Sequence, residues 1–236
     1  MCICDKGVRG IKVKIRKPII KLCILISIIG VLSYLMYLIG YVPIIGNIIA
    51  EKKLSNYATI QKGSTQKIET KHDWYNAKYQ SVKGNLSYRL QKNTIYDENV
   101  SRKVSLSAEN QYNKIKGEFP QNLSFPKGIT VWTEFDADNY SIKSQRLYLL
   151  GVYNTEDISE EESEKMCATI ADKFINLMGE DYNFTGIQII YYDKNGSYES
   201  AISSNGFKKL EYDEILSKTE KVDRFPEDYL NLLSKQ

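Results

Sequence analysis

The sequence predicts an α+β fold, in which one long apolar helix precedes a domain of mainly antiparallel sheets covered by helices. Three observations predict it: an uncharged run stands near the N-terminus, strand-like runs recur in pairs after it, and helical patterns alternate with those pairs. A hydrophobic content of 42% with 18 tyrosines among 236 residues is typical of a chain that folds around a core.

The run from Leu22 to Tyr41 contains twenty residues, carries no charge and is apolar on every side. At about 1.5 Å per residue, a helix of that length crosses a hydrocarbon core of about 30 Å. A buried soluble helix would show a polar face, and a cleavable signal peptide would have a shorter apolar region that ends in small residues. We therefore expect a transmembrane helix within residues 22–46, which ends where Pro43 and Gly46 interrupt it.

Charge sets the expected orientation of this helix. Residues 1–21 carry seven cationic side chains against Asp5 alone, whereas only Lys52 and Lys53 follow the apolar run closely. The positive-inside bias then predicts a single-pass protein of the cell membrane, with a cytoplasmic N-terminus and an extracytoplasmic C-terminal domain. Because the whole chain carries only +3, the part after residue 21 is net negative. That balance gives no electrostatic basis for binding nucleic acid.

Cysteine usage fits this arrangement. Of the four cysteines only Cys167 lies in the predicted outer domain, so no disulfide can form within that domain. The sequence leaves open whether Cys2 or Cys4 in the basic tail is lipidated.

The first part of the outer domain mixes helical and strand patterns. A short helix is expected near residues 54–61. Residues 73–79 and 86–90 alternate apolar and polar side chains around a Lys83-Gly84-Asn85 turn, which is typical of a hairpin with one buried face. Apolar side chains at helical spacing predict a helix over residues 100–115.

The second part has clearer local signals. Ser159 and Glu162 form a capping box at the start of a helix whose apolar stripe ends before Gly179. The Asp193-Lys194-Asn195-Gly196 segment is a strong turn signal between two strand-like runs. The branched and aromatic runs expected to form strands are residues 129–135, 147–153, 184–192 and 197–202.

These patterns predict five segments and leave open whether the two sub-domains share one core. A helix after Pro226 also stays open. The segments are a basic cytoplasmic tail (1–21), the transmembrane helix (22–46), a first α+β sub-domain (47–120), a second with the capped helix and the hairpin (121–204), and a charged C-terminal tail (205–236).

Four features carry a resemblance to a known family: the helix near Asn56-Tyr57, the Trp74-Tyr75 strand, the Tyr96-Asp97 strand end and the hairpin of residues 184–202. In this layout the chain resembles the YfjL-like bacterial membrane-anchored proteins, which pair an N-terminal membrane helix with small α+β regions. The resemblance implies a bacterial surface protein of uncharacterised role. It implies no activity or site residues, and it does not cover the charged C-terminus.

The sequence offers little catalytic chemistry. His72 is the only histidine, which excludes multi-histidine metal sites, and we expect it to be an ordinary exposed residue at a strand edge. Cys167 lies beside the apolar stripe of the capped helix and is expected to be a buried hydrophobe. The acidic run of residues 160–164 suits a helix N-terminus. We therefore assign no catalytic, cofactor-binding or metal-binding residues, and we expect neither an enzyme nor a cofactor.

The aromatic side chains are the one suggestive feature. Trp74, Tyr75, Trp132 and Tyr140 are the candidates for a surface that stacks on a glycan or an envelope protein, with burial in the core as the alternative. We therefore expect a non-catalytic extracytoplasmic module that is held by the lipid bilayer and binds a partner at the cell envelope. The alternative function is a cell-wall or peptide hydrolase that uses carboxylates such as Asp136 and Asp138.

Overall fold

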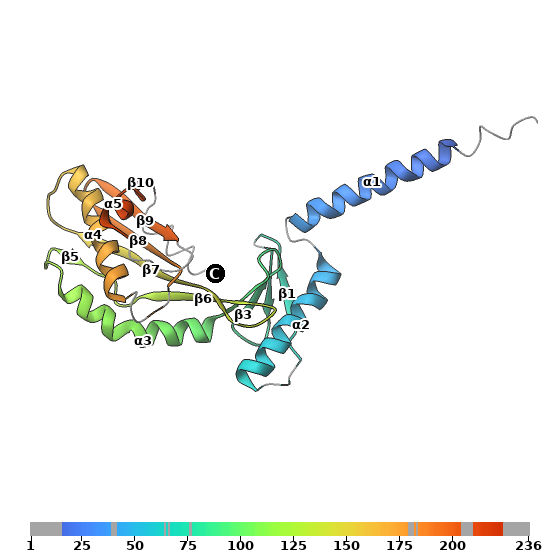
Figure 1. Cartoon of the computed structure of the whole chain (residues 1–236), viewed down its shortest axis with the longest axis horizontal. Helices are drawn as coiled ribbons and strands as arrows, with labels where there is room; N and C mark the ends of the chain where they lie inside the picture. The colour runs from blue at the N-terminus through green and yellow to red at the C-terminus, as the bar shows by residue number, and fades with distance from the viewer. Residues whose placement is uncertain are drawn as a thin grey trace, which may run out of the picture.

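The described part of the chain contains five helices and one mixed sheet of ten strands (Figure 1). This computed structural model describes residues 16–38, 42–63, 65, 67–75, 77–178, 182, 184–203 and 210–223. The strand order is β1-β2-β3-β4-β6-β7-β8-β9-β10, and β5 pairs with β7. Only the β7–β8 pair among these described strands is parallel. The predicted α+β class with a mainly antiparallel sheet is confirmed.

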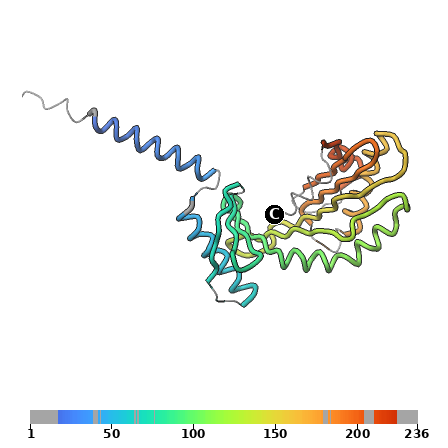
Figure 2. The backbone as a smooth tube through the Cα atoms, turned by 180° about the vertical axis from the view of Figure 1, so that it is seen from behind, coloured from blue at the N-terminus to red at the C-terminus, as the bar shows by residue number. Residues whose placement is uncertain are grey.

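The first helix, α1 (Arg16–Leu38), stands apart from the folded domain (Figures 1 and 2). Its residues Pro18–Leu38 are long and apolar enough to cross a membrane, and its most apolar window is 0% buried inside the protein. The core helix of a soluble protein would bury such side chains. A helix of this composition near an N-terminus serves as a membrane anchor or as a signal sequence.

The second helix, α2 (Pro43–Lys62), is much longer than the helix predicted near residues 54–61. Residues 43–46, which the sequence placed in the span, form its first turn. Pro43 starts this helix. Proline has no backbone N–H group, and the first residue of a helix needs none, so proline is well suited to that position. The helix ends at Gly63, whose φ of 64° is the left-handed conformation typical of a helix C-terminus.

A first core forms where α2 packs on a four-stranded meander. Leu54 and Tyr57 of α2 are fully buried against Tyr88, Ile95 and the other apolar side chains of the strands. The strands are β1 (Thr70–Asp73), β2 (Lys78–Ser81), β3 (Leu86–Arg89) and β4 (Thr94–Asp97).

The predicted strand over residues 73–79 is wrong, because a turn interrupts it between β1 and β2. β1 ends at Asp73, whose side chain accepts a hydrogen bond from the backbone N–H of Tyr75 at 3.0 Å. Ala77 has a φ of 49°, a turn conformation, before β2 begins at Lys78. An aspartate side chain that accepts the backbone N–H two residues later forms a turn, and this turn ends the strand even though apolar and polar side chains continue to alternate. Trp74 and Tyr75 therefore lie in the β1–β2 turn and not in a strand.

A second core lies beneath the larger part of the sheet. Phe174, Leu147 and Ile189 are fully buried in it, together with Ala108 and Tyr112 of α3. Its elements are α3 (Glu98–Gly117), β5 (Leu123–Ser124), β6 (Thr130–Asp136), β7 (Ile142–Asn154), α4 (Glu160–Met178), β8 (Gly186–Asp193), β9 (Gly196–Ser203), α5 (Tyr212–Leu216) and β10 (Thr219–Val222).

Several predicted elements of this part are confirmed. The Asp97 side chain accepts the N–H groups of Asn99 and Val100, so α3 begins just before the predicted residues 100–115. The capping box exists, since the Ser159 N–H donates to Glu162 at 2.8 Å and the Glu162 N–H donates to Ser159 at 3.3 Å. β8 and β9 form the predicted hairpin.

Two predicted segment boundaries differ from the observed elements. The segment of residues 205–236, predicted as a charged tail, contains α5 and β10, which dock through Ile215 and Thr219. The predicted helix after Pro226 lies outside the described residues. The predicted division between residues 120 and 121 falls after α3, yet the buried apolar side chains of α3 belong to the second core.

The described helices that cover the sheet lie on a single face of it. Along β6, Val131, Thr133 and Phe135 are buried toward α3 and α2, and β7 turns Leu147 and Leu149 the same way. Because side chains alternate along a strand, Trp132 and Glu134 lie on the opposite face. Figure 2 shows α3 running along one side of the β6–β7 pair. The prediction of helices on one side of the sheet is confirmed.

Close packing between α2 and β2 gives the first prediction. A Cβ atom at Gly46 would overlap the Tyr79 ring, whereas a Cβ atom at Gly117 would meet no atom within 4 Å. Gly46→Ala is expected to lower the free energy of unfolding by about 1–3 kcal/mol through overpacking, while Gly117→Ala leaves it unchanged or raises it slightly. Urea unfolding of the detergent-solubilised chain measures both, and equal midpoints for the two variants would contradict the predicted packing.

Candidate functional site

The four candidate aromatic residues lie in three separate places. Trp74 and Tyr75 are 58% and 98% exposed in the β1–β2 turn. Trp132 is half-buried on β6, on the face that carries no described helix. Tyr140 lies in the β6–β7 turn with a φ of 60°, and its ring packs on Tyr57 at 5.9 Å. They therefore do not form one aromatic surface, and Tyr140 packs against the first core, as the alternative expects.

Trp132 instead belongs to a cluster that strand pairing assembles. Its ring stacks on Tyr96 with 3.7 Å between centroids, and the Arg89 guanidinium lies 5.6 Å from the Trp132 ring centre. Arg89 also forms an ion pair with Glu134 at 3.4 Å. Tyr96 is the direct cross-strand partner of Glu134. We call these four residues, Arg89, Tyr96, Trp132 and Glu134, the aromatic platform.

The platform carries no net charge, because its one cation, Arg89, is paired with its one carboxylate, Glu134. Burial raises the pKa of the Tyr96 phenol, so its hydroxyl stays protonated at physiological pH. Glu134 is only 8% exposed and balances the charge of Arg89. A flat ring pair with one cation and one carboxylate can stack on a sugar or an aromatic side chain while hydrogen-bonding its polar groups.

The same face of the sheet continues from the platform onto β7, β8 and β9. Arg146 is the cross-strand partner of Trp132. Beyond it lies an open groove of about 230 Å³, lined by Arg146, Tyr148, Gly186, Ile187, Gln188, Ala201, Ile202 and Ser203. Gln188 donates a hydrogen bond to Glu199 at 2.6 Å. This face thus combines stacking surfaces with hydrogen-bonding side chains.

Sequence reasoning found Trp132 but not its neighbours. Arg89 and Tyr96 are far from Trp132 along the chain, and only the β3–β4–β6 register brings them together. Glu134 could have been found from the sequence, because it alternates with buried residues in the same strand as Trp132.

The carboxylates of the alternative hydrolase function serve other interactions. Asp136 accepts the backbone N–H groups of Asp138 and Asn139 and shapes the β6–β7 turn. Lys53 forms a hydrogen bond and an ion pair with Asp138, which hold the pKa of that exposed carboxyl below its usual value. A general acid needs a raised pKa and a sheltered position. Asp138 provides neither, and the Asp136 carboxylate is engaged in the β6–β7 turn.

His72 and Cys167 lie in different parts of the fold. His72 is half-buried on β1, where its ring packs on Trp74 at 5.2 Å and on Tyr79 at 4.7 Å. Cys167 is fully buried in the second core, with its Sγ atom 3.4 Å from Ser200 Oγ. Burial raises the pKa of the Cys167 thiol to about 12. The expected buried cysteine is confirmed, whereas His72 is less exposed than expected.

The acidic run at the start of α4 is used by the fold. Glu162 caps the helix, and the N–H and hydroxyl donors of Ser159 lower its pKa. Glu161 pairs with Lys165, and Glu160 pairs with Lys221 of β10 at 2.7 Å. Among the described residues, no group of three or more His, Cys, Asp or Glu side chains could hold a metal ion.

Comparison with protein-family models, with curated proteins and with solved structures finds no match to this chain. The resemblance to the YfjL-like proteins stays a prediction.

The burial of Cys167 gives the second prediction. In a variant with Cys2, Cys4 and Cys23 changed to serine, a thiol with a pKa of about 12 has roughly one thiolate in ten thousand molecules at pH 8. Iodoacetamide at that pH is therefore expected to leave the folded protein unlabelled and to label it quickly in urea, as mass spectrometry would record. Rapid labelling without urea would contradict this burial.

Proposed function

We propose that this chain is a single-pass membrane protein whose outer domain binds a partner at the cell envelope without catalysing a reaction. Support for the anchor is the length and composition of α1, which has no contact that buries it within the described residues. Support for binding is the aromatic platform, in which the rings of Tyr96 and Trp132 stack beside the Arg89 guanidinium.

The proposed orientation rests on charge. Cationic residues precede α1 in excess, and the residues that follow it carry far fewer, so the bias favours a cytoplasmic N-terminus and an extracytoplasmic domain. The domain is net negative, which gives no electrostatic support for a nucleic-acid partner.

Site-specific labelling tests the orientation. Asn113 is exposed on α3, and Asn113→Cys in a variant whose native cysteines are replaced is expected to react with a membrane-impermeant maleimide in whole cells. A cysteine placed at Lys12 in the same background should react only after permeabilisation. The reverse pattern would overturn the orientation, and recovery of the unlabelled chain as a soluble protein without detergent would overturn the anchor.

The proposed partner is an envelope glycan or an extended protein segment. Stacked aromatic rings bind the flat apolar faces of sugars and side chains, and Arg89 adds a fixed planar donor beside them. The groove beyond Arg146 extends this surface across β7, β8 and β9, which suits an elongated ligand better than a compact one.

Crosslinking from opposite faces of the sheet tests this binding surface. A photoreactive residue at Arg146, beside the platform, is expected to capture a partner in intact envelopes, whereas one at Ile60, 63% exposed on α2, should not. Trp132→Ala is expected to weaken the captured interaction roughly 30-fold, the effect of losing a central aromatic contact. Equal capture from both faces, or a Trp132→Ala variant that folds and binds normally, would contradict the proposal.

A further inference from the structure

The first half of α2 is apolar on the side that faces away from the protein as well as on the side that packs. Gly46 and Ala50 face the first core, yet Ile44, Ile45 and Ile48 are 76%, 62% and 62% exposed. Adjacent large aliphatic side chains on one exposed patch mark a contact site in most proteins. Asn47 is the one polar side chain in the first two turns of α2, and charged side chains begin at its third turn, with Glu51 and Lys52.

The β1–β2 turn adds two exposed aromatic residues at the same end of the first core. The Tyr79 hydroxyl donates to the Val42 carbonyl at 3.2 Å, so the Tyr79 ring lies against the start of α2. His72 packs on Tyr79, and Trp74 packs on His72. Two ring contacts therefore connect Trp74 to the Tyr79 ring at the start of α2. Exposed Tyr75 follows it in the turn.

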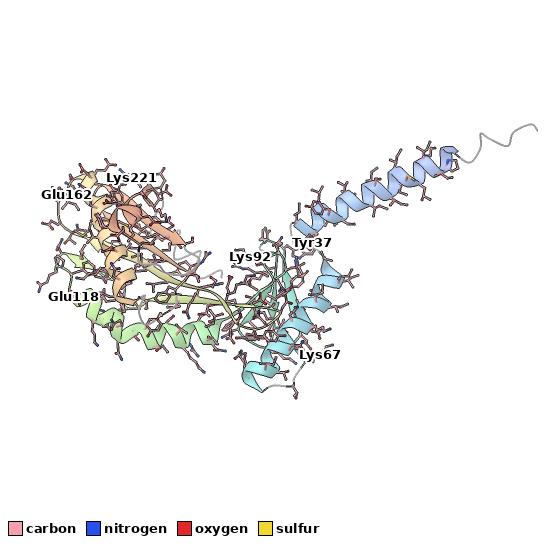
Figure 3. The ribbon with its side chains drawn as sticks, in the orientation of Figure 1. Tyr37, Lys67, Lys92, Glu118, Glu162 and Lys221 are labelled. Atoms are coloured by element: carbon pink, nitrogen blue, oxygen red, sulfur yellow. The ribbon has the colours of Figure 1, made fainter. Side chains whose placement is uncertain are left out.

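The end of α1 lies at this same place. The side chain of Gln91, in the β3–β4 turn, donates a hydrogen bond to the carbonyl of Leu38, the last residue of α1. Figure 3 shows Tyr37 of α1 and Lys92 at this end of the first core, with Lys67 at the opposite end. The exposed isoleucines and aromatic rings therefore lie at the same end of the first core as the end of α1.

We infer that Ile44, Ile45, Ile48, Trp74 and Tyr75, the proximal surface, lie in the headgroup region of the bilayer that α1 crosses. The first turns of α2 then form an interfacial helix, and the first core rests on the membrane. This inference depends on the proposed anchoring.

Physical chemistry favours lipid as the occupant of the proximal surface. Isoleucine side chains gain about 1.5–3 kcal/mol each when they leave water completely. Tryptophan and tyrosine rings accumulate at the membrane–water boundary, because they are apolar with one polar atom. Exposed Lys52 and Lys92 border the surface and suit anionic headgroups. The anchor also keeps a bilayer permanently beside these residues, whereas a second copy would have to be recruited.

Tryptophan fluorescence tests the inference in the full chain, because Trp74 and Trp132 are its two tryptophans. Trp132→Phe reports on Trp74 alone, and Trp74→Phe reports on Trp132 alone. Both variants are reconstituted in vesicles of phosphatidylcholine and phosphatidylglycerol, with and without bromine near the headgroup end of the acyl chains. Trp74 emission is expected to fall by roughly half, since an interfacial ring lies about 5–10 Å into the headgroup and acyl boundary. Trp132 emission should not change.

A matched pair on α2 gives a second measurement. Ile48 and Ile60 are 62% and 63% exposed on the same helix, but only Ile48 belongs to the proximal surface. Each is changed to cysteine, in the background without other reactive cysteines, and labelled with an environment-sensitive fluorophore. The label at position 48 is expected to be quenched by the brominated lipid and the label at position 60 is not.

The outcomes separate this inference from the proposed anchor. If the protein floats with the vesicles but Trp74 and position 48 are quenched no more than Trp132 and position 60, the inference is overturned and the anchor stands. If the protein does not float, both fail. If the label at position 48 becomes exposed to water when the protein is diluted in excess lipid, a second copy of the chain covers the surface, and the inference is again overturned.

Discussion

The pairing of β6 with β4 on one side and β7 on the other is the constraint on which the domain depends. Phe135 at one end of β6 is buried in the first core, and Val131 toward the other end is buried in the second. The register shifts between Glu134 and Phe135, where the strand passes from one core to the other. A bulge of this kind bends a strand without ending it. The two cores therefore share one hydrogen-bonded sheet.

The same strand also positions the candidate binding surface. Because side chains alternate along β6, the residues that fill the cores leave Trp132 and Glu134 on the face away from the helices. A shift of one residue in the β4–β6 register would move both into the cores and separate Tyr96 from Trp132. Packing and recognition thus depend on one register.

The elements predicted well from the sequence have strong local signals. Ser159 and Glu162 identify the start of α4, and the residues at 193–196 identify the β8–β9 turn, because these interactions join near neighbours in the chain. The short edge strand β10 was missed because its pairing with β9 is decided by the sheet and not by its own charged sequence. The first turn of α2 was assigned to the span because its isoleucines continue the apolar run. The sequence identifies only Trp132 of the aromatic platform, because the strand register that brings its neighbours together is not encoded locally.

The connection between α1 and α2 limits how the domain can move. Four residues separate Leu38 from Pro43, and the five Cα–Cα steps between these two residues reach at most about 18 Å. In a chain whose α1 crosses a bilayer, the domain would diffuse laterally with its anchor and stay at nearly constant height. Such confinement gives molecules held in the same membrane a high effective concentration, whereas soluble competitors gain nothing. A weak intrinsic affinity would then be sufficient for lasting association.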